Sequence, residues 1–251
     1  MAYRRELFQL ERFHAEAGYD AAFLYWNLRG LLAERWAHGP VFAGWATAQE
    51  QTNLIPKADG DDTRIYAAYG IKASGVLAEG ERWTQEAPDL ARQWLPDVYE
   101  VLAPVRTVRV SVNLFGLYPA GERQAAIQAS RRIRRRYYQN DNLEFVLPER
   151  LRQAHPDSYH AAIDWLAEDS RNRTSLIVGA VGPLHAGTFF QWPWAERDTT
   201  WWIGFNYTTG HVAESDDETI EKPLDVFNGM IDYALQDLQH AADVVLPEVF
   251  P

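Results

Sequence analysis

Two distant segments of the chain share a residue pattern, and this feature constrains the fold more than any other. Residues 55–66 read IPKADGDDTRIY and residues 192–202 read WPWAERDTTWW, so both contain Pro-x-Ala-acid followed by Asp and Thr. Pro193 follows Pro56 after about 137 residues. Each copy leads into alternating apolar residues and then into an amphipathic helix pattern. The repetition predicts an internal duplication, although any two hairpin–helix units resemble one another and a chance likeness stays open.

The apolar positions of the two predicted units correspond. The strand positions are Ile65, Ala67, Tyr69 and Ile71 in one unit and Trp201, Ile203, Phe205 and Tyr207 in the other. The helix positions are Leu90, Trp94, Val98 and Val101 against Phe227, Ile231, Leu235 and Leu238. Amphipathic helices beside half-buried strands predict an α+β fold, in which a mostly antiparallel sheet carries helices on one face. The two α-β-β-α halves are expected to be related by a pseudo-two-fold axis.

This pattern divides the chain into four parts. Residues 1–18 are predicted to form an N-terminal helix, and residues 19–105 the first half. Residues 106–155 are predicted to be a connecting strand and an arginine-rich helix, and residues 156–251 the second half. All four parts are expected to share one compact domain.

Local patterns assign the individual elements. Helices are predicted at residues 4–17, 20–36, 84–103, 121–138 and 157–169, and a long one at the C-terminus. Strands are predicted at residues 43–55, 65–71 and 106–117, in the SLIVGAVG segment and in the TTWWIGFNYT segment. Thr84 is the expected N-cap of its helix, and Pro96 is expected to kink that helix or to mark its start.

Composition excludes several classes of protein. Hydrophobic residues make up 47% and charged residues 24%, which is typical of a globular chain. The absence of cysteine excludes disulfides, thiolate nucleophiles and cysteine zinc sites. A net charge of -11 makes nucleic acid an unexpected partner. The chain shows neither an apolar signal core nor a membrane-length apolar run, so we expect a cytoplasmic protein without a membrane partner.

Five arginines form the first candidate binding feature. They occupy one broad arc of the predicted helix at residues 121–138, opposite Ile133 and Tyr137. Such a face pairs with acidic segments of the same chain or of another copy, or it binds phosphate or nucleic acid. Internal pairing or solvation is the favoured interpretation. The residues are Arg131, Arg132, Arg134, Arg135 and Arg136.

Aromatic residues form the second feature. Trp192, Trp194 and Trp202 lie in a dense aromatic segment near the end of the second unit. Alternation places Trp202 on the strand face opposite Phe205 and Tyr207. Core packing accounts for one face, and the other face is a candidate binding surface because tryptophan provides a large contact area.

Metal and catalytic candidates are weaker. His160, Asp164 and Glu168 share one face of the predicted helix at residues 157–169, but this face is polar and a solvated surface explains it better. His185, His211 and Asp198 are loop or strand-end residues with side chains suited to acid–base chemistry. Glycine spacing matches neither a phosphate-binding loop nor a dinucleotide fingerprint, so no cofactor is expected.

These observations favour a non-catalytic binding protein. It would hold a protein partner or a small ligand on an aromatic surface or in the cleft between its halves. One alternative is an enzyme that uses His185, His211 and Asp198 as an acid–base site. Others are phosphate or nucleic-acid contact through the arginine helix, and self-association of that helix with acidic runs.

Overall fold

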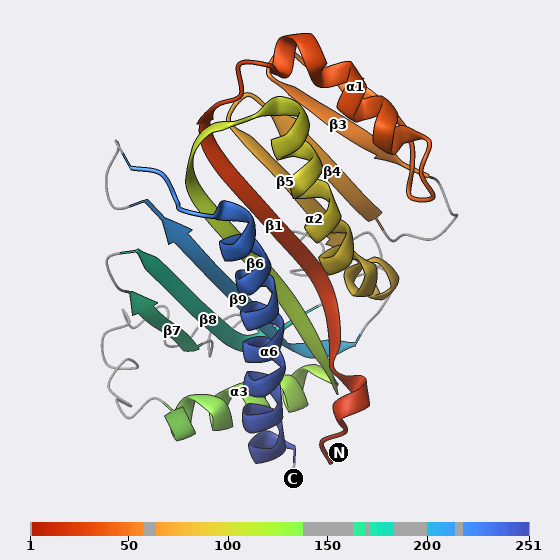
Figure 1. The fold of residues 1–251 in the computed structure, drawn as a ribbon. Helices are drawn as coiled ribbons and strands as arrows, with labels where there is room; N and C mark the ends of the chain where they lie inside the picture. The colour runs from red at the N-terminus through yellow and green to blue at the C-terminus, as the bar shows by residue number, and fades with distance from the viewer. Residues whose placement is uncertain are drawn as a thin grey trace, which may run out of the picture.

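The computed structural model describes residues 2–57, 64–137, 163–168, 171–182, 200–213 and 218–250. They form one antiparallel sheet with helices on one face, so the predicted α+β fold class is confirmed (Figure 1). The strands are β1 (Gln9–Ala21), β2 (Phe42–Thr47), β3 (Gln51–Pro56), β4 (Arg64–Gly70), β5 (Ala73–Glu79), β6 (Val105–Gly121), β7 (Ile163–Glu168), β8 (Asn172–Val181) and β9 (Trp201–Val212). The helices are η1 (Arg5–Leu7), α1 (Tyr25–Ala37), α2 (Glu81–Leu102), α3 (Arg123–Tyr137) and α6 (Pro223–Val249).

The sheet is built around its two longest strands. The nine strands described lie in the order β2-β3-β4-β5-β1-β6-β9-β8-β7, and all neighbours pair antiparallel. β1 pairs with β6 along nearly its whole length, with Phe13 opposite Leu114 and Ala17 opposite Val110. The central pair therefore joins an early segment of the chain to one that follows about a hundred residues later.

β1 replaces the helix predicted at residues 4–17. Phe13, Ala15 and Ala17 are buried under the helices, whereas His14 and Glu16 between them point to the opposite face. This is the two-residue period of a strand. The apolar spacing from Leu7 to Phe13 also fits a helix, but pairing on both edges of β1 decides in favour of the strand. The predicted N-terminal helix over residues 1–18 is wrong for the same reason.

α2 and α6 cover the centre of the sheet side by side, with α1 and α3 at the two ends of the helix layer (Figure 1). Their predicted apolar stripes are confirmed. α2 buries Leu90, Trp94, Val98 and Val101. α6 buries Phe227, Ile231 and Leu238, and Leu235 is half-buried. None of the described helices combines the length and apolar character needed to cross a membrane.

Other predicted elements differ from the structure. Residues 163–168 form strand β7, so the helix predicted at residues 157–169 is wrong over that part. The strand predicted at residues 43–55 is two strands joined by a short turn, and β5 was not predicted. α2 continues through Pro88 and Pro96, and its N-cap is Gly80 rather than Thr84. Gly80 has a φ of 90°, a conformation that residues with a Cβ rarely adopt.

The elements on the two sides of the central pair follow a similar order, but the predicted correspondence of strands does not hold. β4 contains Ile65 and Tyr69 and is separated from β1 by β5, whereas β9 pairs directly with β6. β4 and β9 therefore occupy different positions relative to the centre. Most of the shared sequence pattern lies outside the described residues, and the duplication itself stays a prediction.

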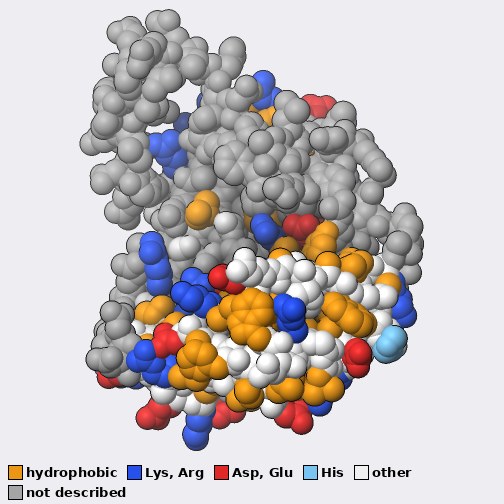
Figure 2. Space-filling view, turned by 90° about the horizontal axis from the view of Figure 1, so that it is seen from above, with side chains coloured by type: hydrophobic (Ala, Val, Ile, Leu, Met, Phe, Trp, Pro, Cys, Tyr) orange, Lys and Arg blue, Asp and Glu red, His pale blue; other side chains and the backbone are white. Residues whose placement is uncertain are grey.

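The outer side of α1 carries two large apolar side chains among polar and charged ones. α1 buries Tyr25, Leu32 and Ala33 on its inner side, while Trp26 and Leu31 are exposed on its outer side. Figure 2 looks onto the end of the molecule where α1 lies and shows hydrophobic side chains exposed there among charged ones. Exposed apolar side chains are thus present on α1, where the sequence did not predict them.

Candidate functional site

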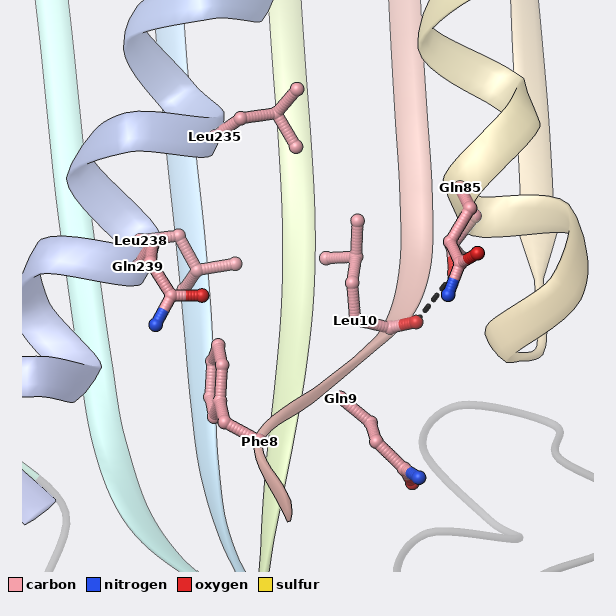
Figure 3. A pocket seen from close by; sticks show the side chains of 8 residues that line it. Phe8, Gln9, Leu10, Gln85, Leu235, Leu238 and Gln239 are labelled. Carbon is pink, nitrogen blue, oxygen red and sulfur yellow. Dashed lines mark hydrogen bonds between the residues drawn. The ribbon is translucent and has the colours of Figure 1, made fainter. Parts of the chain in front are cut away.

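A cleft lies between α2 and α6, on the helix side of the central strands (Figure 3). Its volume is about 210 Å³. α2 precedes β6 in the chain and α6 is the last helix, so the cleft lies between the early and late parts of the fold. The lining residues are Phe8, Gln9, Leu10, Thr84, Gln85, Leu235, Leu238 and Gln239.

Phe8 enters the cleft from the segment just before β1. Its ring contacts Phe205 edge-on, with the centroids 5.5 Å apart and the planes at 84°. The ring also lies directly over Gly116 of β6, where a Cβ would collide with it. Gly116 therefore leaves the space that the Phe8 ring occupies as one apolar wall of the cleft.

The first turn of α2 forms the opposite wall and is tied to β1. The Thr84 hydroxyl donates a hydrogen bond of 2.5 Å to the carbonyl oxygen of Leu10. The Gly80 amide donates to the Glu11 carbonyl at 2.9 Å. These bonds hold the start of α2 in place, and Gln85 follows Thr84 with its amide exposed at the mouth of the cleft (Figure 3).

α6 contributes Leu235, Leu238 and Gln239. The side-chain amide of Gln239 donates to Asp243 Oδ1 at 3.1 Å, and the Tyr3 hydroxyl donates to the same oxygen at 2.6 Å. Burial raises the pKa of Tyr3, and its bond to Asp243 adds to that shift. Asp243 thus orients Gln239 and attaches the N-terminal segment to α6.

An ion pair joins α2 to α6 beside the cleft. Arg92 Nη2 lies 2.6 Å from Asp232 Oδ1, and its Nη1 lies 2.8 Å from Asp89 Oδ1. Asp232 and Leu235 are three residues apart on α6, so the ion pair lies within one helical turn of the cleft. It helps to set the separation of the two helices.

The described lining of the cleft is uncharged. None of the eight lining residues is ionisable, and the polar ones carry three amides and one hydroxyl. Such a lining supplies hydrogen bonds at the rim of an apolar cavity but no general acid or base. In the described part of the chain no three His, Asp or Glu side chains are grouped in a way that could hold a metal ion.

Ionisable side chains gather instead on the opposite face of the central strands. Arg109 pairs with Glu16, and His14 Nε2 lies 3.9 Å from the other oxygen of Glu16. Arg12 Nε lies 3.9 Å from Glu79 on β5. Burial lowers the pKa of His14, with Glu16 opposing this shift and both arginines adding to it. Within this group the charges largely compensate one another.

The described structure contains one of the three predicted acid–base residues, so it does not test whether they lie together. His185 and Asp198 lie outside the described residues. His211 is near the end of β9, where its Nδ1 lies 2.8 Å from the side-chain oxygen of Asn172. It does not line the cleft.

The predicted aromatic surface is only partly described. Trp192 and Trp194 lie outside the described residues. Trp202 lies on the sheet face opposite Phe205 and Tyr207, as expected, but it is only 7% exposed. It is therefore too deeply buried to form an open surface.

Two of the five arginines of α3 contact the C-terminal end of α6. Arg132 Nη1 donates to the Val249 carbonyl at 3.0 Å, and Arg136 Nε donates to Glu248 at 3.2 Å. Cations at a helix C-terminus interact favourably with its unpaired carbonyl groups. Arg131 and Arg135 are exposed, and Arg134 is half-buried. These contacts agree with the favoured interpretation of internal pairing.

The weak metal candidate loses its geometric basis. His160 lies outside the described residues, and Asp164 and Glu168 belong to a strand rather than to the predicted helix. The helical spacing that grouped the three residues therefore does not apply to the last two.

Sequence reasoning found only part of the cleft. Leu235 and Leu238 were predicted as apolar positions of the last helix, but Phe8 and Gln85 were not singled out. The available signal was the alternation of small and polar residues after Leu10, which indicates a strand. No family model, curated protein or solved structure matches the chain.

Proposed function

We propose that the protein is a binding protein that holds a small, uncharged and partly apolar molecule in the cleft between α2 and α6. The observation that carries this proposal is the lining: four apolar side chains with three amides and a hydroxyl, and no ionisable group. A ligand without charge loses little on entering such a site, whereas an unpaired charge is costly to remove from water.

The size of the cleft limits the ligand. A volume of about 210 Å³ is below the range of roughly 300–1,000 Å³ that accommodates drug-sized molecules. The ligand is therefore a compact molecule with one apolar body and one or two hydrogen-bonding groups. The apolar body contacts Phe8, Leu10 and the leucines of α6, and the polar groups meet the amides of Gln85 and Gln239.

A series of similarly shaped probes tests this proposal. Benzamide is neutral, whereas benzoate and benzylammonium carry opposite charges on a similar frame. We expect benzamide to shift the side-chain amide resonances of Gln85 and Gln239 in NMR spectra, and the two charged probes to leave them unchanged. Equal shifts from all three probes, or none from any, would contradict the proposal.

Variants locate the binding. Each of Gln85→Ala and Gln239→Ala removes one hydrogen-bonding amide, and we expect each to weaken benzamide binding by roughly fivefold, since a hydrogen bond contributes about 1 kcal/mol. Gln236→Ala makes the same change on the exposed side of α6 and is the matched control. Unchanged affinity in both cleft variants would place the ligand elsewhere.

A further inference from the structure

The polar groups that line the cleft between α2 and α6 differ in the hydrogen bonds that they still have to offer. An amide nitrogen and a hydroxyl donate protons, whereas a carbonyl oxygen only accepts. Two lining residues on opposite walls, Gln239 and Thr84, already donate to neighbouring groups of the fold. These existing bonds determine which kind of hydrogen bond each residue presents to a ligand.

The side-chain amide of Gln239 is held in one orientation. Gln239 and Asp243 are four residues apart on α6, so they lie on the same side of the helix, and Gln239 Nε2 donates to Asp243 Oδ1 at 3.1 Å. Because a carboxylate only accepts, the nitrogen of the amide must face Asp243 and the oxygen must face away from it. Figure 3 shows this oxygen on the cleft side of the amide. Gln239 therefore presents an acceptor to a ligand.

Asp243 accepts from other groups as well. The Tyr3 hydroxyl donates to Oδ1 at 2.6 Å, and Arg5 Nη2 lies 3.3 Å from Oδ2. Both oxygens of the carboxylate are thus in contact with donors, so Asp243 has no proton to donate to Gln239. The reversed orientation of the amide would place the Gln239 oxygen against a carboxylate oxygen, and the two acceptors would repel each other.

The opposite wall presents an acceptor too. The Thr84 hydroxyl donates to the Leu10 carbonyl at 2.5 Å, and Thr84 is fully buried. A hydroxyl has a single proton, and its carbonyl partner can only accept that proton. Thr84 therefore has no proton left for a ligand, and a group that reaches it from the cleft meets only its oxygen lone pairs.

Gln85 does not remove this bias. It is exposed at the mouth of the cleft, where its amide can turn to donate or to accept. A ligand without an N–H or O–H group would leave the Gln239 oxygen facing an apolar surface in place of water, and an acceptor without a partner is costly. A site built to pair with a donor rejects an analogue that lacks the donor.

We propose that the cleft selects compact neutral molecules in which an N–H or O–H group lies next to an apolar body, and that Asp243 is the positioning residue that sets this preference through Gln239. This inference rests on the proposed function, because it concerns the same cleft and adds the direction of the hydrogen bond to it.

Two probes of similar shape test the preference. Benzamide and acetophenone share a ring and a carbonyl group, but the NH2 group of the first is a methyl group in the second. In NMR titrations of the full chain we expect benzamide to bind at least about fivefold more tightly. Equal affinities would overturn this inference and leave the proposed function standing, since a neutral apolar molecule still binds. Binding of neither probe would overturn both.

Gln239→Met identifies the acceptor. Methionine has a similar length but no amide, so benzamide should bind about fivefold more weakly, whereas acetophenone should bind at least as tightly as it does to the wild type. Gln236→Met makes the same change on the exposed side of α6 and is the control. An equal loss for both probes in Gln239→Met would indicate an effect of packing and would contradict the inference.

Asp243→Ala separates the orientation of Gln239 from its presence. Without the carboxylate the amide can turn either end toward the cleft, so the preference for benzamide should fall below about twofold. Asp243→Ala also removes the bond to Tyr3, and Tyr3→Phe removes that bond alone. Tyr3→Phe should keep the preference, because Gln239 still donates to Asp243. A preference that persists in Asp243→Ala, or that is lost in Tyr3→Phe, overturns the role assigned to Asp243.

Discussion

At the scale of single residues, His14 is an ionisable group whose pKa is changed by its place in the sheet. It lies on the face away from the helices, between Arg12 and Glu16 on the same strand and near Arg109 of β6. Burial lowers its pKa from the ordinary value of 6.5, and the two arginines act in the same direction. The folded protein therefore keeps His14 neutral at a pH where the unfolded chain already binds a proton.

This shift predicts a dependence of stability on pH. The stabilisation is complete above 6.5 and is lost as the pH falls from 6.5 toward the lowered pKa of the folded state. We expect His14→Gln to reduce the loss of unfolding free energy between about pH 7.5 and pH 5.5, measured by urea denaturation. His240→Gln removes an exposed histidine of α6 and serves as the control. Identical pH profiles for wild type and His14→Gln would refute the prediction.

At the scale of elements, the attachment of α2 to β1 forms one wall of the cleft. The Thr84 hydroxyl is fully buried and donates to the Leu10 carbonyl, so the first turn of α2 cannot move without breaking this bond. The same side chain looked like an N-cap in the sequence. Its actual partner is a strand that local patterns had assigned to a helix.

Replacing Thr84 by valine keeps the shape of the side chain and removes the donor. The Leu10 carbonyl then loses its partner, and we expect the unfolding free energy to fall by about 1–2 kcal/mol in urea denaturation. Benzamide binding should weaken too, because the start of α2 is no longer held against β1. Gln85→Ala, one residue further on and exposed, should change stability by less than about 0.5 kcal/mol. An equal loss in both variants would exclude this role for the bond.

Elements with strong amphipathic patterns were predictable from sequence, and those with weak patterns were not. α2, α3, α6, β6 and β9 were assigned correctly because their apolar residues contrast clearly with polar neighbours, and β8 because it contains a short continuous apolar run. On β1 the two buried positions that follow Phe13 by alternation, Ala15 and Ala17, give little contrast, so a helical spacing fitted equally well. The cleft depends on this strand, since Phe8 and Leu10 reach it only through the pairing of β1 with β6. Local patterns contain no information about that pairing.

At the scale of the whole molecule, the two sides of the sheet share their central strands. β1 pairs with β5 on one edge and with β6 on the other, and β6 pairs in turn with β9. The helix layer also connects the two sides, because Arg92 of α2 forms an ion pair with Asp232 of α6. A loss of structure on one side therefore exposes apolar surface on the other.

Because the two sides of the sheet share β1 and β6, we expect the protein to unfold as one cooperative unit. Val76→Ala, in the buried part of β5, should destabilise the protein by roughly 2 kcal/mol. Hydrogen exchange of amides in β9, far from the substitution, should accelerate by the same free energy as exchange in β4. If β9 keeps its wild-type protection while β4 loses it, the two sides unfold independently.

The long-range pairing of β1 also has a consequence for synthesis on the ribosome. β5 follows β1 soon enough to pair with one of its edges early, but β6 emerges only after a further helix has been translated. During that interval the other edge of β1 has no partner, and an open strand edge invites pairing with another nascent chain. Arg12, His14 and Glu16 are charged or polar side chains of β1, and they are present before β6 has been translated. We expect them to limit aggregation during translation as well as to stabilise the finished sheet.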